Sequence, residues 1–318
     1  MVQVAIMGFG TVGSGAYDIL IENAEGISQN CGQPINVKRI LDLRQFPGHP
    51  AEALVTANFE DILNDSEITI VAEAMGGTSP VYEFTKALLM AGKSVVTSNK
   101  EMVATYGTEL IELAKKHGCK YLFEASVCAA IPIIHPLTQC LAANTITEIK
   151  GILNGTTNYI LTNMQKNGES FDAVLKSAQA KGYAERDPAS DVEGHDTCRK
   201  IAILAWLAFG EHGKNVSWTD IPTTGITQIT LADLQKADED GCVIKLIGHA
   251  KLENNKVTCK VEPMRIPKDS PLANIDGVYN AVLVTGNFTG DVMFYGQGAG
   301  KLATGSSIVG DIMRIVRK

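Results

Sequence analysis

The stretch VQVAIMGFGTVG at residues 2–13 decides the fold of this chain, because it joins an apolar strand pattern directly to a glycine turn. Its second half has the spacing G-x-G-x-x-G and consists of Gly8, Phe9, Gly10, Thr11, Val12 and Gly13. In this pattern the first glycine permits a tight turn and the second lets a pyrophosphate approach the backbone, while the third lets the following helix pack closely. The phosphates then lie at the positive end of that helix. The stretch therefore predicts a dinucleotide site rather than an ordinary glycine turn.

Strand and helix patterns alternate through the first third of the chain. We expect strands at 2–7, 35–41, 68–72, 94–97 and 120–123, and helices at 12–23, 81–91 and 108–117. Apolar strands that alternate with helices imply a parallel sheet covered on both faces. Right-handed crossovers then give an α/β domain of the doubly wound Rossmann type, with its ligand crevice at the carboxyl ends of the strands.

The pattern changes at about residue 131. Helical spacing dominates residues 158–240, and strand patterns return at 243–252, 256–263, 281–285 and 291–295, which indicates an antiparallel sheet. A last amphipathic helix is expected at 300–316. We therefore expect residues 1–130, completed by a C-terminal helix at about 298–318, to form the dinucleotide-binding domain. Residues 131–297 would form a second domain of the α+β class.

Composition excludes several classes of protein. The 318 residues are enough for two coupled domains, and 45% hydrophobic with 20% charged residues is a globular composition. The net charge of −7 argues against nucleic acid or an anionic membrane as a partner. We expect no signal peptide, and the apolar stretch 201–209 is too short to span a bilayer. Seven scattered cysteines without a C-x-x-C pair indicate reduced thiols in the cytoplasm, rather than a zinc site or a disulfide framework.

The choice between NAD and NADP depends on the end of the second predicted strand, where Asp42 and Arg44 lie. An acidic side chain there accepts a hydrogen bond from the ribose 2′-hydroxyl of NAD, whereas an arginine neutralises the 2′-phosphate of NADP. Asp42 lies somewhat beyond the usual distance from the glycines, and both residue types are present, so we favour NADP and keep NAD open. Lys100 ends the stretch VVTSNK at 95–100, which reaches the ligand-binding edge of the sheet. It would face the nicotinamide, a phosphate or the substrate, and a solvent-exposed lysine is the alternative.

The stretch GYAERDPASDVEGHDTCRK at residues 182–200 holds the candidates for proton transfer. Asp196 and Lys200 are four residues apart and share one helix face. That spacing is also typical of a surface ion pair, but this helix continues into the apolar stretch 201–209, which favours burial. A dehydrogenase needs a group that exchanges the alcohol proton while hydride moves. A partly desolvated lysine beside a carboxylate does this, and His195, which would point away from that face, is the alternative.

Several motifs together resemble those of the homoserine dehydrogenases. They are the glycine turn, VVTSNK at 95–100, FEASV at 123–127 with IPI at 131–133, GILNGTTNY at 151–159, and the stretch 182–200. The resemblance continues to GAGKL at 298–302, so it covers nearly the whole chain. It implies NAD(P)-dependent interconversion of L-homoserine and L-aspartate 4-semialdehyde for threonine and methionine biosynthesis. It also implies a cytoplasmic homodimer, with residues 131–297 as the catalytic and dimerisation domain.

The resemblance also implies roles for single residues. Lys200 matches the catalytic lysine, which donates a proton when the semialdehyde is reduced. Glu185 and Asp196 match residues that hold the homoserine amino group and its water shell, and Lys100 matches a lysine where cofactor and substrate meet. Cofactor contacts match Phe9, Thr11, Val12, Gly182 and Gly298. A monovalent-cation site, usually for sodium and made largely of main-chain carbonyls, matches Glu124, Val127, Ala129 and Ile131.

The chain departs from the family pattern at two places. Cys128, Ala129 and Ala130 stand where many relatives carry glycines, and alanine is costly if the backbone there needs a positive φ. Ala303 replaces a common proline, which we expect to be harmless. We expect a short form without the C-terminal amino-acid-sensing domain of many relatives. The alternatives to this function are a catalytically silent dinucleotide sensor and a dehydrogenase for another small amino or hydroxy acid.

Overall fold

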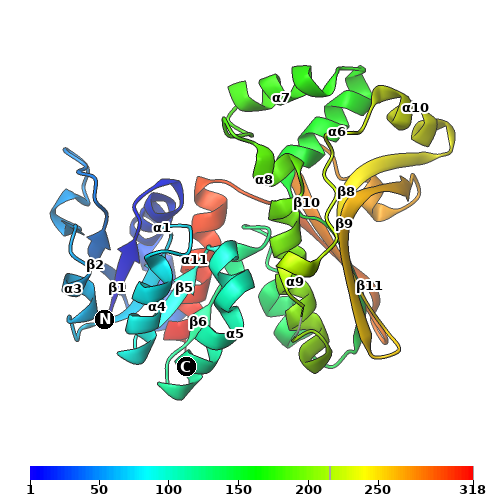
Figure 1. Ribbon diagram of the computed structural model, residues 1–318. Coiled ribbons are helices and arrows are strands. Elements are labelled where there is room, and N and C mark those ends of the chain that lie inside the picture. Colours follow the sequence, from blue (N-terminus) through cyan, green and yellow to red (C-terminus); the bar gives the residue numbers. More distant parts are fainter. Residues whose placement is uncertain (215, 318) are drawn as a thin grey trace. The chain divides into compact units, whose positions relative to one another are not determined.

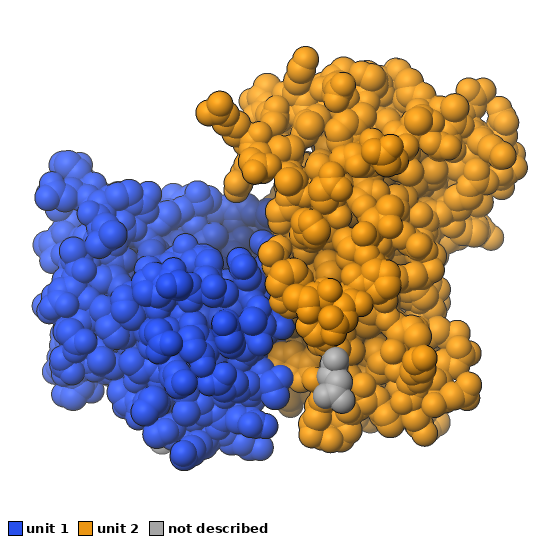
Figure 2. All heavy atoms as spheres, viewed as in Figure 1, with its two compact units in different colours: residues 1–130, 299–318 blue, residues 131–298 orange. Residues whose placement is uncertain are grey.

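In the computed structural model, which describes residues 1–214 and 216–317, the chain folds into two units (Figure 2). Unit 1 consists of residues 1–130 and 299–318, and unit 2 consists of residues 131–298. The C-terminal segment therefore belongs to the same unit as the N-terminus. Among the described residues, no helix combines the length and the apolar character that crossing a membrane requires.

Unit 1 contains a six-stranded sheet in the order β3-β2-β1-β4-β5-β6, and every neighbouring pair of strands is parallel. The strands are β1 (Val2–Met7), β2 (Ile35–Leu41), β3 (Val55–Thr56), β4 (Ile68–Glu73), β5 (Ser94–Thr97) and β6 (Tyr121–Leu122). The helices are α1 (Thr11–Glu22), α2 (Ala24–Cys31), α3 (Glu60–Leu63), α4 (Val81–Met90), α5 (Lys100–Lys116) and α11 (Lys301–Val316). The strand order reverses between β1 and β4, and in such sheets ligands bind outside the carboxyl ends of the strands at this point. The predicted Rossmann-type fold class is confirmed.

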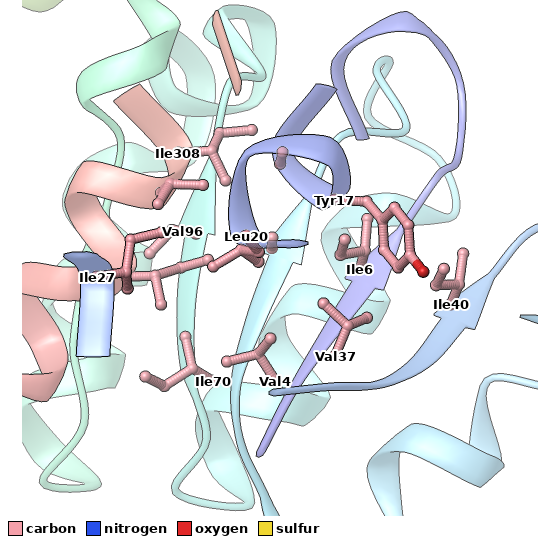
Figure 3. Close-up of a cluster of buried hydrophobic side chains, with 14 of the residues drawn as sticks. Val4, Ile6, Tyr17, Leu20, Ile27, Val37, Ile40, Ile70, Val96 and Ile308 are labelled. Atoms are coloured by element: carbon pink, nitrogen blue, oxygen red, sulfur yellow. The ribbon is translucent and has the colours of Figure 1, made fainter. Parts of the chain in front are cut away.

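The core of unit 1 lies where α1, α2 and α11 cover the sheet (Figure 3). Figure 3 shows Val4, Ile6, Val37, Ile40, Ile70 and Val96 of the strands together with Tyr17, Leu20, Ile27 and Ile308 of the helices. Helices α1 and α11 approach closely because glycines line their contact. A Cβ atom on Gly15 would lie 2.3 Å from the carbonyl oxygen of Lys301, and one on Gly305 would lie 2.7 Å from the carbonyl carbon of Gly15. These contacts integrate the C-terminal helix into unit 1.

Unit 2 contains a five-stranded antiparallel sheet in the order β11-β10-β7-β8-β9. Its strands are β7 (Ile146–Ile152), β8 (Cys242–Glu253), β9 (Lys256–Pro267), β10 (Tyr279–Gly286) and β11 (Gly290–Gln297). Its helices are α6 (Gly155–Asn167), α7 (Phe171–Ala180), α8 (Ala189–Val192), α9 (His195–Phe209) and α10 (Leu231–Glu239). Helices α6 and α9 lie on one side of this sheet (Figure 1). Helix α9 packs directly on β8, because Thr197 and Ile201 lie 3.1 Å from the place of a Cβ atom on Gly248.

Several elements differ from the sequence-based expectation, among them the short β3 and α3, which were not predicted. Strand β7 and helix α2 were not predicted, and α5 begins at Lys100 rather than at residue 108. In β7 the apolar alternation is interrupted by Glu148 and Lys150, which bind each other on one face of the sheet. The start of α5 is specified by a side chain rather than by periodicity, because the carbonyl oxygen of the Asn99 side chain accepts a hydrogen bond from the amide of Met102.

Candidate active site

The glycine turn connects β1 to α1 in unit 1, and two of its glycines are required by geometry. Gly8 has a φ of +89°, a backbone conformation that favours glycine. A Cβ atom on Gly13 would lie 1.9 Å from the carbonyl oxygen of Gly8, so only glycine lets the first turn of α1 approach the strand. Gly10 is the N-cap of α1, and no side chain caps the helix there. The amide groups of this helix start are therefore available for a phosphate.

Asp42 follows β2 and holds the glycine turn in place. Its carboxylate accepts hydrogen bonds from the amide of Phe9 at 2.7 Å and from the amide of Arg44 at 2.9 Å. The guanidinium of Arg44 donates two more, from Nε at 2.9 Å and from Nη2 at 2.8 Å. The Arg44 contact lowers the pKa of the Asp42 carboxyl well below its usual value. A carboxylate has about four acceptor positions, so these four donors saturate Asp42.

Arg44 itself lies beside the turn and remains accessible. Its side chain is 62% exposed, and its guanidinium lies over the ring of Phe46 at 5.3 Å from the ring centre. Its Nη2 atom is 3.8 Å from the place of a Cβ atom on Gly10. The structure thus holds a fixed positive charge next to the predicted pyrophosphate position.

The carboxyl ends of β4 and β5 carry a buried polar network that the sequence reasoning missed. Glu73 is fully buried and accepts hydrogen bonds from the Thr97 hydroxyl and from the amides of Met75 and Gly76. Burial raises the pKa of the Glu73 carboxyl, and these hydrogen bonds oppose the shift. Asn99 extends the network by donating to the carbonyl of Gly77 at 2.6 Å. Lys100 follows directly as the first residue of α5 and is half-buried.

The predicted cation-site residues lie in an irregular segment after β6. Cys128 and Ala129 have φ values of +54° and +35°, so the backbone takes the left-handed region without glycine there. Such conformations cost of order 1–3 kcal/mol each and are concentrated at functional sites. Two contacts with α11 hold the segment: the Glu124 amide donates to Asp311 at 2.8 Å, and the Ser307 hydroxyl donates to the Ala129 carbonyl. Glu124, Val127, Ala129 and Ile131 are all buried.

Oxygen donors dominate that segment. Within residues 1–214 and 216–317 no group of three or more His, Cys, Asp or Glu side chains could hold a metal ion. The segment holds one buried carboxylate, on Glu124, and the main-chain carbonyls of its residues are further oxygen donors. Hard cations prefer such oxygen donors, so the residues present fit a cation of the sodium type.

Helix α9 of unit 2 carries the predicted pair of Asp196 and Lys200. The Lys200 Nζ atom donates to the Asp196 carboxylate at 2.7 Å and to the main-chain carbonyl of Leu153 at 2.7 Å. Asp196 is 4% exposed and Lys200 is 8% exposed, so this is a buried pair rather than a surface ion pair. His195 is exposed. The expectation that Asp196 and Lys200 share a buried helix face is confirmed.

Two further residues of the cluster were not found by sequence reasoning. Asn154 donates from its side-chain amide to Asp191 at 2.7 Å and to Asp196 at 2.9 Å. Burial and the neighbouring Asp196 raise the pKa of the Asp191 carboxyl. The only signals in the sequence were the two carboxylates within the stretch 182–200 and the asparagine in GILNGTTNY. In the sequence Asn154 is 37 residues from Asp191 and 42 residues from Asp196, so no local spacing reveals these contacts.

The remaining predicted residues of unit 2 lie in the loop between α7 and α8 and directly after β11. Thr156 donates from its hydroxyl to the carbonyl of Tyr183 at 2.6 Å and so joins this loop to α6. Gly182 has a φ of +74°, and the side chain of Glu185 is exposed. Gly298 lies beside Asn280, whose Oδ1 is 2.1 Å from the place of a Cβ atom on that glycine.

Comparisons with known proteins agree with this arrangement. Residues 8–124 match the family model "Homoserine dehydrogenase, NAD binding domain", and residues 132–313 match the model "Homoserine dehydrogenase". The homoserine dehydrogenase of Synechocystis is 45% identical over 99% of this chain and 73% of its own length. The crystal structure of a homoserine dehydrogenase from Thiobacillus denitrificans has a TM-score of 0.94 and 41% identity, and the match covers 99% of this chain and 73% of that one.

A third relative is matched over nearly its whole length. A hyperthermophilic archaeal homoserine dehydrogenase, solved in complex with NADPH, has a TM-score of 0.83 and 28% identity, and the match covers 99% of this chain and 97% of that one. The family models and the relatives together cover both units. The chain therefore belongs to the homoserine dehydrogenases, the NAD(P)-dependent oxidoreductases that interconvert L-homoserine and L-aspartate 4-semialdehyde in threonine and methionine biosynthesis.

Proposed function

We propose that Lys200 carries the proton in this reaction and that Asp196 is its partner. The observation that carries the proposal is the buried contact of the Lys200 Nζ atom with Asp196 and with the Leu153 carbonyl. These two contacts hold the Lys200 nitrogen at a fixed place beside the carboxylate, as a proton carrier requires.

The chemical step follows from this arrangement. When homoserine is oxidised, Lys200 as the neutral amine accepts the hydroxyl proton while the carbonyl forms at the terminal carbon. The nicotinamide cofactor, when bound, would supply the acceptor for the hydride that leaves that carbon. In the reverse direction Lys200 as the ammonium donates its proton to the new alkoxide oxygen. General acid–base catalysis of this kind contributes about 10²- to 10⁴-fold to the rate.

The acidic groups around Lys200 favour an amino-acid substrate. With Asp191, Asp196 and Lys200 all ionised, the cluster carries one net negative charge, which attracts the ammonium group of homoserine. We assign that group to Asp196 and Glu185, and Glu185 is exposed on a loop tied to α6. Lys100 at the start of α5 is assigned to the substrate carboxylate or to the cofactor.

We assign NADP as the preferred cofactor, held by the glycine turn of residues 8–13 and by Arg44. The four donors that saturate Asp42 leave it no lone pair for the ribose 2′-hydroxyl of NAD. The exposed guanidinium of Arg44 beside the turn suits the 2′-phosphate. The archaeal relative that was solved with NADPH supports the same choice. Gly182 and Gly298 are kept as proposed cofactor contacts of unit 2.

A sodium ion and a dimer complete the proposal. The ion would bind Glu124 and the main-chain carbonyls of Val127, Ala129 and Ile131, and its role would be structural.

The dimer would form through the face of the unit 2 sheet opposite to α6 and α9. Tyr279 and Tyr295 stack on that face with ring centres 5.2 Å apart, and Tyr295 is 53% exposed. All seven cysteines are free thiols, which suits the reducing cytoplasm that we propose as the compartment.

Substitution of Lys200 tests the proton carrier. Lys200→Ala should lower kcat for homoserine oxidation by about 10²- to 10⁴-fold. Lys200→Arg should be nearly as inactive, because arginine keeps the positive charge but does not lose its proton. Binding of NADP, measured by fluorescence titration, should change little in either variant. Lys176→Ala on the exposed face of α7 is the matched control and should be fully active.

Two results would contradict the assignment. Near-normal turnover of Lys200→Ala would exclude Lys200 as the proton carrier. Recovery of activity in Lys200→Arg would show that only the charge is needed. Activity of the wild-type protein with another small hydroxy or amino acid, and none with homoserine, would instead change the substrate.

A further inference from the structure

The junction between β7 and α6 supplies two different contacts to the cluster around Lys200. The Leu153 main-chain carbonyl accepts a hydrogen bond from Lys200, and the next residue, Asn154, donates from its side chain to both Asp191 and Asp196. Asn154 is 5% exposed. One dipeptide thus contacts all three charged side chains of the cluster.

The orientation of the Asn154 amide is fixed by its second role as the N-cap of α6. Its Oδ1 atom accepts from the main-chain amide of Thr157 at 2.8 Å and from the Thr157 hydroxyl at 3.0 Å. A main-chain amide can only donate, so Oδ1 must face the helix and Nδ2 must face the carboxylates. The acceptor atom makes two hydrogen bonds, and both Nδ2 hydrogens have acceptors, so the full capacity of the amide is used.

This orientation also fixes the state of two carboxylate oxygens. Because Nδ2 only donates, Asp191 Oδ1 and Asp196 Oδ2 must both accept there, and neither can direct a proton toward the amide. Asp196 Oδ2 is also the atom that accepts from Lys200. The position of that oxygen is therefore set from two sides, by an amide that cannot flip and by the lysine.

We propose that Asn154 is a positioning residue of the reaction: its side-chain amide separates Asp191 from Asp196, keeps both as acceptors, and thereby holds Asp196 where it orients Lys200. This inference rests on the proposed role of Lys200. In this proposal, Asn154 does not contact the reacting atoms and acts only through Asp196. Burial and Asp196 raise the pKa of the Asp191 carboxyl, while the hydrogen bond from Asn154 lowers it, and Lys200 lowers it too.

Two substitutions separate the amide bridge from helix capping. Serine and aspartate are both good N-caps, so both variants keep an acceptor for the Thr157 amide. Asn154→Asp removes both N–H donors, and Asn154→Ser leaves one hydroxyl hydrogen, which cannot bridge the two carboxylates. Asn154→Asp also adds a third carboxylate to the cluster. The matched controls are Asn167→Ser and Asn167→Asp, which make the same changes at an exposed position of the same helix.

The full-length variants would be compared by kcat for homoserine oxidation as a function of pH. In Asn154→Ser we expect kcat to fall about ten- to a hundredfold, since a displacement of about 1 Å costs up to 10²-fold. The acid limb of the kcat profile should move to higher pH, because Asp191 loses a hydrogen bond that stabilises its ionised form. Asn154→Asp should be more severely affected. The NADP dissociation constant and Tm should stay close to those of the wild-type protein and of the Asn167 controls.

The outcomes distinguish this inference from the proposed function. If Asn154→Ser keeps kcat within threefold and the acid limb does not move, while Lys200→Ala is inactive, Asn154 is only a helix cap and the role of Lys200 stands. A lower Tm with an unchanged pH profile would lead to the same conclusion. If Lys200→Ala is active, the proposed function fails first. A fall in kcat with a shifted limb and an unchanged Tm supports the positioning role.

Discussion

The guanidinium of Arg44 is the single group on which the choice of cofactor depends. Replacing it by alanine removes the proposed partner of the 2′-phosphate and at the same time releases two acceptor positions of Asp42. Arg44→Ala should raise KM for NADP about ten- to a hundredfold, since a hydrogen bond to a charged group contributes about 1.5–3 kcal/mol. KM for NAD should stay the same or fall, because Asp42 becomes able to accept from the ribose 2′-hydroxyl.

Initial rates with homoserine and each dinucleotide measure this effect. Arg39→Ala, on β2 in the same unit, removes an arginine that donates to the Lys38 carbonyl, and it serves as the control for loss of charge. An unchanged ratio of the two KM values in Arg44→Ala would assign cofactor choice to another residue.

Side-chain contacts were predictable from the sequence only where they are local. The spacing of Asp196 and Lys200 placed both on one helix face, and the apolar stretch after them indicated burial. The bridge from Asn154 to Asp191 and the network from Glu73 to Thr97 join residues 37 and 24 positions apart. Such contacts depend on how strands and helices pack, so no pattern within one element reveals them.

At the scale of elements, the contact between α1 and α11 depends on a small residue in the C-terminal helix. A Cβ atom on Gly305 would lie 2.7 Å from the carbonyl carbon of Gly15 and 2.8 Å from the amide of Ala16. Gly305→Ala should therefore destabilise the protein by about 1–3 kcal/mol, as overpacking of a core does. Gly310→Ala, on the same helix, meets no atom within 4 Å and should stabilise it by about 0.5–1 kcal/mol.

Urea unfolding followed by circular dichroism compares the two variants. Their shifts should have opposite signs, because both gain the same helix propensity and only Gly305 faces backbone. Destabilisation of similar size in both would mean that the contact is not the cause.

Elements with regular apolar spacing were predicted well, and those specified by other interactions were not. Strands β1, β2 and β5 have the predicted bounds. Helix α2 has the sequence AEGISQNC, in which only Ile27 is buried, so its amphipathic signal is weak. Tertiary packing of that one side chain under α11, rather than local propensity, stabilises the helix there.

At the scale of the whole molecule, burial ranks the seven thiols by reactivity. Burial raises the pKa of Cys259 to about 12 and also raises the pKa of Cys198, whereas Cys140 is exposed. The thiolate is the reactive form, and a pKa of about 12 leaves roughly one part in 10⁴ of Cys259 as thiolate at pH 8. Iodoacetamide at pH 8 should therefore label Cys140 well before Cys198 and Cys259.

Peptide mass spectrometry over a time course measures this order. Labelling in concentrated guanidinium chloride is the control and should reach all seven thiols at similar rates. Labelling of Cys259 in the native protein as fast as Cys140 would contradict the raised pKa of Cys259.

The proposed dimer can be tested at the part of the unit 2 sheet that β10 and β11 form, on the face opposite to α9. Met293 pairs with Leu283 in register and is 38% exposed, and Tyr295 lies two residues further on the same face. In the proposed dimer, this apolar row would be covered by the same row of a second copy of the chain. Met293→Glu would bury a charge in the middle of that contact. Met90→Glu makes the same change at a 55% exposed position of α4 in unit 1.

Sedimentation velocity at micromolar concentration should give a dimer for the wild-type protein and for Met90→Glu, and a monomer for Met293→Glu. A wild-type protein that sediments as a monomer would refute the dimer, and a dimeric Met293→Glu would place the contact on another surface.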